Sequence, residues 1–211
     1  HLVEPEHSYV SRGGVKLANA LDAFGIVPAG MSVMDAGAST GGFTDCLLQR
    51  GAERVFAVDV GYGELAWSLR NDPRVEVRER TNVRSLTRGD LPWEVQLVVC
   101  DVSFISLAKV MPALLDCAGE DGQVVAMIKP QFEVGRALVG KGGVVRDPST
   151  RREALISVGR AAEAEGAHVL GYATSGLPGP KGNRETFIHV VRRAPASHAG
   201  TIEELALTVE P

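Results

Sequence analysis

The stretch VMDAGASTGGFTDCLLQRG, residues 33–51, is the most informative part of the chain, because an apolar strand runs into a glycine-rich turn and a helix leaves it. Gly37, Gly41 and Gly42 lack a Cβ, so they tolerate unusual backbone angles and let a ligand come close to the chain. The following helix offers unpaired N–H groups in its first turn. The stretch predicts a cradle for a nucleotide-sized cofactor. A tight strand-to-helix turn without a ligand is the alternative interpretation.

The order of residues in the turn separates it from the dinucleotide fingerprint GxGxxG, whose second glycine admits a pyrophosphate. Asp35 at the strand end would repel a phosphate, but it suits a cation or an amino group. S-adenosylmethionine carries both, in its sulfonium and amino-acid end. We therefore expect this cofactor to bind at Asp35, Gly37, Ala38, Ser39, Thr40, Gly41, Gly42 and Phe43.

Length and composition indicate one α/β domain with its own core. A domain of this size should bury about 70% of the surface of the unfolded chain. Cys46, Cys100 and Cys117 lack CxxC spacing and lie in apolar contexts, so we expect reduced core thiols. None of the histidines has ligand spacing, so no metal is expected. Without an apolar run of roughly 18 residues or a signal peptide, we expect a cytoplasmic protein with no membrane contact.

The predicted domain organisation is a linker from a missing N-terminal domain at 1–14, a catalytic domain at 15–194 and a C-terminal tail at 195–211. The net charge is −4, but two segments are basic. In residues 132–152 five basic side chains oppose two acidic ones, and in residues 178–193 four oppose one. Local positive charge on an acidic chain indicates an anionic substrate.

Apolar runs alternate with helical stretches, which predicts βαβ units and a mostly parallel sheet. The final two strands should be antiparallel, because no crossover helix separates them. We expect strands at 32–35, 54–59, 75–78, 95–101, 123–129, 168–174 and 186–192. We expect helices at 15–24, 42–50, 63–69, 107–117 and 149–165.

Charged residues end several of these apolar strands, at the edge where open α/β sheets bind ligands. Asp59 is placed to accept hydrogen bonds from a ribose diol, with a helix N-cap as the alternative. Asp101 and Lys129 follow runs too apolar to be solvated, so the two charges should meet; a purely structural ion pair is the alternative. Lys16 and Glu185, taken alone, favour ordinary surface charges, and Trp67 favours core packing.

Five motifs together resemble the FtsJ-like ribose 2′-O-methyltransferases, and among these the TlyA haemolysin-like ribosomal RNA methyltransferases. The motifs are SRGGVKL (11–17), DAGASTGGF (35–43), DVSFIS (101–106), KPQFE (129–133) and GNRE (182–185), and the resemblance covers nearly the whole chain. It implies an α/β, Rossmann-like class I S-adenosylmethionine-dependent fold, with a seven-stranded, mostly parallel sheet and an antiparallel last strand. It also implies a Lys-Asp-Lys-Glu catalytic tetrad, which maps onto Lys16, Asp101, Lys129 and Glu185.

The resemblance further implies 2′-O-methylation of ribosomal RNA, on a cytidine, with ribosomal RNA or ribosomal subunits as partners. The sequence does not give the oligomeric state, for which we take a monomer as the working expectation. Many S-adenosylmethionine enzymes hold the adenine with an acidic residue after the third strand, whereas this chain offers Thr81 and Asn82. TlyA-like proteins carry an N-terminal S4-type RNA-binding domain, which this sequence lacks. Further expected cofactor contacts are Val60, Thr81, Asn82 and Asp101; expected RNA contacts are Arg12, Arg136, Lys141, Lys181 and Arg184.

A ribose hydroxyl is a poor nucleophile, so it must be aligned with the donor methyl and hydrogen-bonded to a group that can take its proton. Lys129 is our candidate. Asp101 should keep it charged, whereas burial and a neighbouring Lys16 favour the neutral amine, and the sequence leaves both open. Residues 132–147 are expected to form a mobile lid that touches RNA phosphates, or else a disordered surface loop. The rival functions are a nucleotide-binding oxidoreductase and a non-catalytic RNA-binding or haemolysin-like protein.

Overall fold

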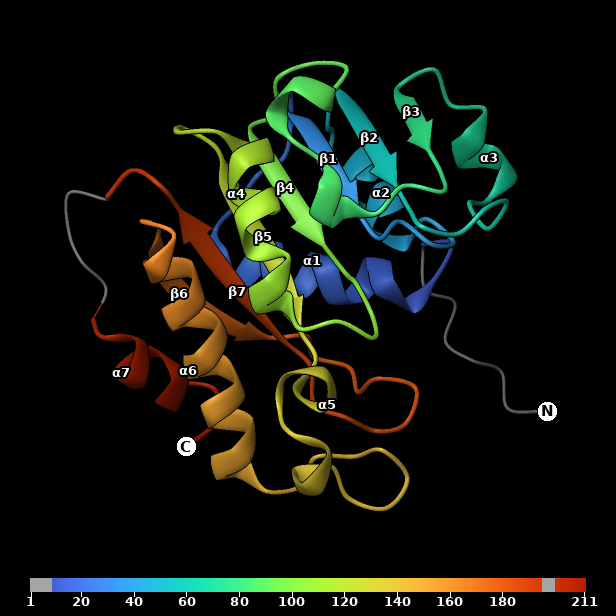
Figure 1. Cartoon of the computed structure of the whole chain (residues 1–211). Helices are drawn as coiled ribbons and strands as arrows, with labels where there is room; N and C mark the ends of the chain where they lie inside the picture. The colour runs from blue at the N-terminus through green and yellow to red at the C-terminus, as the bar shows by residue number, and fades with distance from the viewer. Residues whose placement is uncertain (1–8, 195–199) are drawn as a thin grey trace.

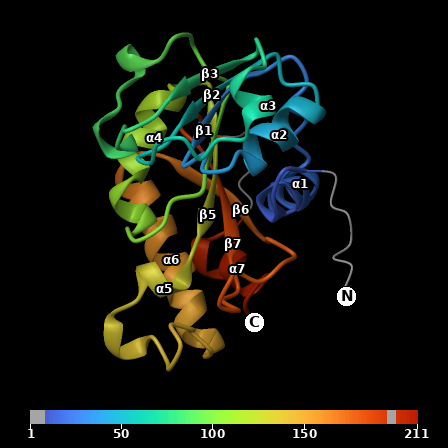
Figure 2. The ribbon, with the colours of Figure 1, turned by 90° about the vertical axis from the view of Figure 1, so that its right-hand side faces the viewer.

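The computed structural model describes residues 9–194 and 200–211 of the chain. Residues 1–8 of the expected linker and 195–199 of the expected tail lie outside the described residues. A seven-stranded sheet forms the centre of the described part, and helices cover both of its faces (Figure 1, Figure 2). The predicted α/β fold with a seven-stranded sheet is confirmed.

The sheet is mixed, with its antiparallel strand placed as predicted. Its strands are β1 (Ser32–Ala36), β2 (Arg54–Val58), β3 (Val75–Arg78), β4 (Leu97–Cys100), β5 (Gln123–Ile128), β6 (His168–Thr174) and β7 (Thr186–Val191). They lie in the order β3-β2-β1-β4-β5-β7-β6. Neighbouring strands from β3 to β5 pair in parallel, and β7 runs antiparallel to both β5 and β6. The chain thus reverses its strand order beside β1, where open sheets bind their ligands.

Two apolar layers enclose the sheet. The helices are α1 (Arg12–Phe24), α2 (Gly42–Gln49), α3 (Trp67–Arg70), α4 (Met111–Ala118), α5 (Pro130–Glu133), α6 (Pro148–Ala164) and α7 (Ile202–Leu207). Side chains of α1, α2 and α3 pack on one face, and those of α4, α6 and α7 pack on the other. Within β1, Val33 joins the first layer and Met34 the second, because successive strand residues point to opposite faces.

Helix α1 begins at Arg12, three residues earlier than predicted, so part of the expected linker belongs to the domain. Its start lies very close to the start of α2. A Cβ on Gly42 would overlap Ser11 Oγ and lie 2.9 Å from the backbone nitrogen of Gly14. Because Gly42 has no side chain, the start of α2 can pack closely against the start of α1.

The prediction that Trp67 packs in the core is wrong, since its side chain is 79% exposed. Helix α3 is a single turn at the sheet edge, shorter than the predicted helix at 63–69. Leu65 and Leu69 fill the space beneath it, which leaves Trp67 outside. The predicted helix at 107–117 is also divided, into a 3₁₀ turn at Leu107–Lys109 and α4.

Two short helices were not predicted. Helix α5 is one turn that follows β5 directly. Helix α7 lies within the expected C-terminal tail and packs against α6 and β6. Thr201 and Glu204 cap it reciprocally, and Ile202 and Ala206 are buried beneath it. The described end of the chain is therefore part of the domain.

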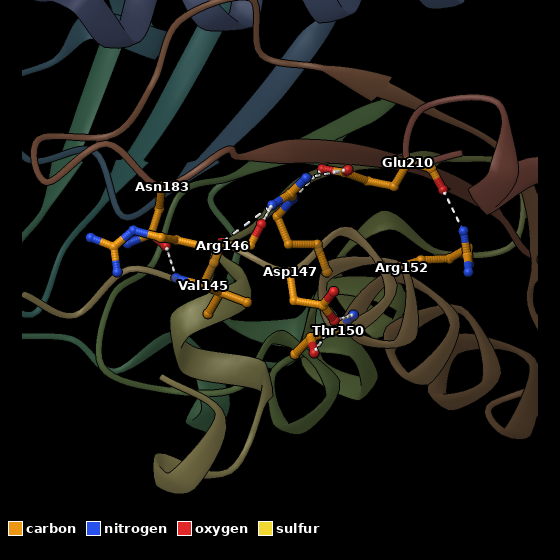
Figure 3. Close-up of polar contacts among 8 residues, drawn as sticks. Val145, Arg146, Asp147, Thr150, Arg152, Asn183 and Glu210 are labelled. Atoms are coloured by element: carbon orange, nitrogen blue, oxygen red, sulfur yellow. Dashed lines mark hydrogen bonds and ion pairs between the residues drawn. The ribbon is translucent and has the colours of Figure 1, made fainter. Parts of the chain in front are cut away.

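A buried ion pair fastens this end of the chain to α6. The Arg151 guanidinium donates two hydrogen bonds to the Glu210 carboxylate, at 2.6 and 2.7 Å, and both side chains are almost fully buried. The guanidinium also donates to the Arg146 carbonyl at 2.6 Å. The neighbouring Arg152 donates to the Glu210 carbonyl at 3.1 Å (Figure 3). Glu210 thus binds two successive arginines at the start of α6.

The three cysteines are free and buried, as predicted. None of the helices within residues 9–194 and 200–211 has the length and apolar character needed to cross a membrane.

The buried pair predicts a large loss of stability on removal of one partner. Glu210→Ala leaves the Arg151 guanidinium buried without a carboxylate, so the free energy of unfolding should fall by about 3 kcal/mol in urea titrations. Glu203→Ala is the matched control, because its partner Arg160 is exposed and the variant should unfold like the parent. Equal midpoints for both variants would contradict this.

Candidate active site

Two adjoining cavities open at the carboxyl ends of β1, β2, β4 and β5. The first measures about 440 Å³ and lies between the start of α1, the turn after β1 and the loop before β7. The second measures about 560 Å³ and lies over the ends of β2 and β4. Gly37, Ser39 and Asp101 line both cavities. The glycine-rich turn is therefore the wall that the two spaces share.

The turn depends on its glycines. Gly37 and Gly41 have φ values of 89° and 100°, in the left-handed region, and a Cβ on Gly37 would overlap the Asp101 carbonyl oxygen. The backbone N–H groups of Gly37 and Ala38 donate to the Val58 carbonyl, at 2.8 and 3.1 Å, which ties the turn to the end of β2. Gly41 faces Leu69 instead of the cavity. The predicted turn residues that line the first cavity are Gly37, Ala38, Ser39, Thr40, Gly42 and Phe43.

Asp35 lies behind the turn and lines neither cavity. It is fully buried, with one carboxylate oxygen accepting a hydrogen bond from Thr44 Oγ1 at 2.7 Å and the other without a partner. The pKa of this carboxyl is raised to about 7, chiefly by burial; the neighbouring Asp101 and Asp59 also raise it, and the hydrogen bonds from Thr44 lower it. The sequence predicted a direct cofactor contact. The structure separates Asp35 from the cavities by the turn itself.

Asp59 fastens the turn from the other side. One of its carboxylate oxygens accepts from the Ser39 N–H at 2.8 Å and the other from the Gly61 N–H at 2.7 Å. It also lines the second cavity, so its remaining lone pairs face the place predicted for a ribose. Glu64, which the sequence did not single out, lines the same cavity and accepts a hydrogen bond from Ser39 Oγ at 3.2 Å.

The far wall of the second cavity is apolar with a polar rim. Val58, Val83, Val102 and Ile105 supply apolar surface, which suits the flat face of a base. The predicted contacts Val60, Thr81 and Asn82 lie on the same cavity. The Asn82 side chain accepts from the Arg84 N–H at 3.1 Å, so its oxygen is partly engaged in the following turn.

The first ion pair of the expected tetrad joins helix α1 to the loop that precedes β7. Lys16 on α1 and Glu185 before β7 form a direct ion pair, and both residues are buried, at 8% and 3% exposure. Both line the first cavity. The interpretation of these two as ordinary surface charges is therefore wrong. Their spacing in sequence concealed a pair that only the fold brings together.

The second tetrad pair faces the same cavity. Lys129 Nζ lies 2.5 Å from Asp101 Oδ1, which confirms the prediction that these two charges meet. Lys129 also donates to Ser103 Oγ at 2.8 Å. Two lysines and two carboxylates thus surround one space, and each ammonium has a carboxylate partner.

Short contacts join the segment after β4 to the segment after β5 along their lengths. The Phe104 ring lies 5.2 Å from the Phe132 ring, and the Glu133 carboxylate accepts from Ser106 Oγ at 2.6 Å and from the Leu107 N–H at 2.7 Å. Burial raises the pKa of Glu133. These contacts hold the segment that carries Asp101. They also hold Phe104, which has φ 64° and is 91% exposed.

The predicted RNA-binding residues surround the cavities without forming one patch. Arg12 lines the first cavity, and its guanidinium donates to the Pro178 carbonyl at 3.1 Å. Lys181 lines a third cavity of about 320 Å³, which shares Lys129 and Glu185 with the first. Arg136, Lys141 and Arg184 are exposed on the two loops that flank this third cavity.

Sequence reasoning missed several residues that shape the site. Ser103, Glu133 and Asn183 belong to the motifs DVSFIS, KPQFE and GNRE, so their positions beside tetrad residues were an available signal. Glu64 had no such signal. In the described part of the chain, no cluster of three or more His, Cys, Asp or Glu side chains could hold a metal ion.

Comparison with known proteins finds relatives over most of the chain. Residues 9–192 match the FtsJ-like methyltransferase family. The 16S/23S rRNA (cytidine-2′-O)-methyltransferase TlyA of Mycobacterium tuberculosis is 56% identical over 187 residues, which are 89% of this chain and 70% of that protein.

Two solved structures superpose on most of the chain. A provisionally named hemolysin of Streptococcus thermophilus superposes with a TM-score of 0.88 at 40% identity, over 97% of this chain and 75% of that one. Fibrillarin of Aeropyrum pernix, solved with bound S-adenosyl-L-methionine, superposes with a TM-score of 0.59 at 14% identity, over 85% of this chain and 76% of that one. The second likeness concerns the fold alone.

The buried Asp35 predicts an unusual pH dependence of stability. Its pKa is raised from 3.8 to about 7 in the folded state, so the folded protein holds a proton that the unfolded chain releases between these values. Stability should therefore fall as pH rises through this window.

Asp35→Asn removes this titration, so its stability relative to the parent should increase from pH 4 to about pH 7 and then stay level. Urea unfolding at several pH values measures the difference, which also cancels the titration of other carboxylates. A difference that is flat with pH would refute the assignment.

Proposed function

The chain belongs to the FtsJ-like methyltransferase family and is a methyltransferase, and from this we propose that it methylates the 2′-hydroxyl of a ribose in ribosomal RNA, with S-adenosylmethionine as donor. The observation that carries the proposal is the pair of lysine–carboxylate ion pairs around one cavity, directly against the glycine turn. The acceptor side and the donor side of a methyl transfer are thereby adjacent.

The residues present suit S-adenosylmethionine. Gly37 and Ser39 line both cavities, so the turn would lie against the bound cofactor. Asp59 and Glu64 would accept hydrogen bonds from the ribose, and the apolar wall of the second cavity would receive the adenine. When bound, the cofactor supplies an electrophilic methyl group on a positively charged sulfur.

We propose that Lys129 acts as an ammonium ion, because Asp101 forms an ion pair with it and Ser103 accepts a hydrogen bond from it. The charge would orient a lone pair of the ribose oxygen and stabilise the negative charge that develops on it. With S-adenosylmethionine bound, the ribose oxygen so oriented would accept the methyl group as the sulfonium becomes a neutral thioether, and the hydroxyl proton would leave late, to water. The buried Lys16–Glu185 pair would fix the ribose on the opposite side of the cavity.

The RNA substrate is proposed from the relatives and from charge. The Mycobacterium tuberculosis relative is named for cytidine methylation of 16S and 23S rRNA, and we propose the same substrate class and nucleotide for this chain. The exposed Arg136, Lys141 and Arg184 would meet RNA phosphates beside the third cavity. A cytoplasmic location and a monomeric state remain predictions.

The two rival functions differ in the ligand that they require. Isothermal titration with S-adenosylhomocysteine and with NAD separates a methyltransferase from an oxidoreductase. Binding of NAD without binding of S-adenosylhomocysteine would contradict the proposal that S-adenosylmethionine is the cofactor. Haemolysin names occur among the relatives, so a non-catalytic function is tested by methyl transfer itself.

Lys129→Ala should reduce tritium transfer from labelled S-adenosylmethionine to ribosomal RNA by about 100-fold or more, because the charge that stabilises the developing alkoxide is lost. Affinity for S-adenosylhomocysteine should change by less than about twofold. Lys109→Ala, at an exposed lysine away from the cavities, is the matched control and should transfer normally. Retained transfer in Lys129→Ala would remove this residue from the mechanism.

The double variant Arg136→Ala, Lys141→Ala should bind ribosomal RNA more weakly. If both side chains contact phosphates, the dependence of log affinity on log salt should become shallower by about 1 to 2 units. Filter binding at several salt concentrations measures this slope. The same slope as the parent would show that the two residues do not reach the RNA backbone.

A further inference from the structure

Asn183 joins two loops that lie on either side of the third cavity. One is the 134–147 loop between α5 and α6, and the other is the 175–185 loop between β6 and β7, which ends at Glu185. Asn183 is almost fully buried, at 2% exposure. Its side-chain nitrogen donates to the Gly143 carbonyl at 2.8 Å. Its side-chain oxygen accepts from the Val145 N–H at 3.0 Å (Figure 3).

The side-chain amide of Asn183 therefore forms hydrogen bonds with a backbone carbonyl and a backbone N–H of the 134–147 loop, as the backbone of a neighbouring strand would. A buried N–H or carbonyl left without a partner costs free energy, so the two bonds fix this part of the loop to Asn183. Figure 3 shows Asn183 and the Val145 backbone facing each other across the two loops.

The other side of the same backbone is held by the buried arginine. Arg151, fixed by Glu210, donates to the Arg146 carbonyl at 2.6 Å and to the Val145 carbonyl at 3.4 Å. Residues 143–146 are thus anchored from two directions. The exposed remainder of the loop, which carries Arg136 and Lys141, projects from this anchored part.

Asn183 also holds its own loop against the tetrad. Its backbone carbonyl accepts from the Gly179 N–H at 2.9 Å, and the Gly182 N–H donates back to Gly179 at 2.8 Å. Gly179 in turn lies against the tetrad carboxylate, since a Cβ there would be 2.6 Å from Glu185 Oε1. A displacement of Asn183 would therefore move the turn that packs on Glu185, and Glu185 is the partner of Lys16.

We propose that Asn183 is a positioning residue that couples the 134–147 loop to the Glu185–Lys16 pair, so that RNA bound on this loop favours the catalytic arrangement of the tetrad. The inference rests on the proposed function. It assigns to Asn183 no contact with the reacting atoms: the residue acts through Gly143 and Val145 on one side and through Gly179 on the other. Loop and tetrad then form one mechanically connected unit, which bound RNA stabilises.

The test compares Asn183→Ala, which loses both side-chain bonds, with Asn183→Asp, which keeps an acceptor for Val145 but places a second oxygen against the Gly143 carbonyl. Both should lower kcat for methylation of deproteinised ribosomal RNA by about tenfold or more, while the Kd of S-adenosylhomocysteine changes by less than about twofold. Asn71→Ala removes an exposed amide just after the end of α3 and should leave both values unchanged. Unchanged kcat in Asn183→Ala would overturn the proposal.

A double-mutant cycle distinguishes coupling from a local structural defect. In the parent, Arg136→Ala with Lys141→Ala should lower kcat as well as RNA affinity. In the Asn183→Ala background the same loop changes should still weaken RNA binding but should no longer alter kcat. Independent, multiplicative effects on kcat would overturn the coupling.

Hydrogen exchange gives a readout that does not depend on activity. Added ribosomal RNA should protect the amides of 134–147 in the parent and in Asn183→Ala, and direct contact at Arg184 is common to both proteins. The Gly179 and Gly182 amides, which bond within the turn that Asn183 holds, should gain protection in the parent only. If the parent binds RNA without methylating it, the proposed function fails and the exchange result still decides the coupling. An equal gain of protection at Gly179 and Gly182 in the two proteins would refute the coupling.

Discussion

The close approach of Gly37 to the Asp101 carbonyl is the constraint on which the site depends. With no Cβ between them, the turn after β1 rests directly on the chain leaving β4, and the same contact brings the wall that the first and second cavities share against Asp101. Any side chain at this position would push the two strand ends apart. The two cavities are therefore adjacent because of backbone contact, before any charged group takes part.

The fold was largely predictable from sequence, because hydrophobic periodicity and connection length determine strand type and direction. The turn residues and the Asp101–Lys129 pair were predictable for the same reason, since parallel strands end at one edge. The burial of Lys16 with Glu185 followed only from the family resemblance. Residues 169 positions apart leave no periodic signal of their contact.

The failures have a common physical cause. Trp67 was placed in the core by its size, yet the interior was already filled by neighbouring leucines. Asp35 was placed in the cavity by its charge, yet strand alternation turns it toward Thr44 beneath the turn. Hydrophobicity and charge indicate whether a side chain favours the core or solvent. Its actual position also depends on the neighbouring side chains in space, which the sequence alone does not identify. The non-glycine residues in the left-handed region among those described, Ser39, Arg80 and Phe104, show the same limit, since tertiary contacts hold each in a backbone region that its side chain disfavours.

The pairing of Lys16 with Glu185 has a consequence for biosynthesis. Lys16 is synthesised long before its partner Glu185, and the ion pair between Arg151 and Glu210 can form only after that. A nascent chain can form the β1–β2–β3 half of the sheet and its glycine turn well before β7 exists to complete the site. The cavity that both lysine–carboxylate pairs surround can therefore be complete only after β7 has been synthesised, long after the glycine turn that forms its other wall.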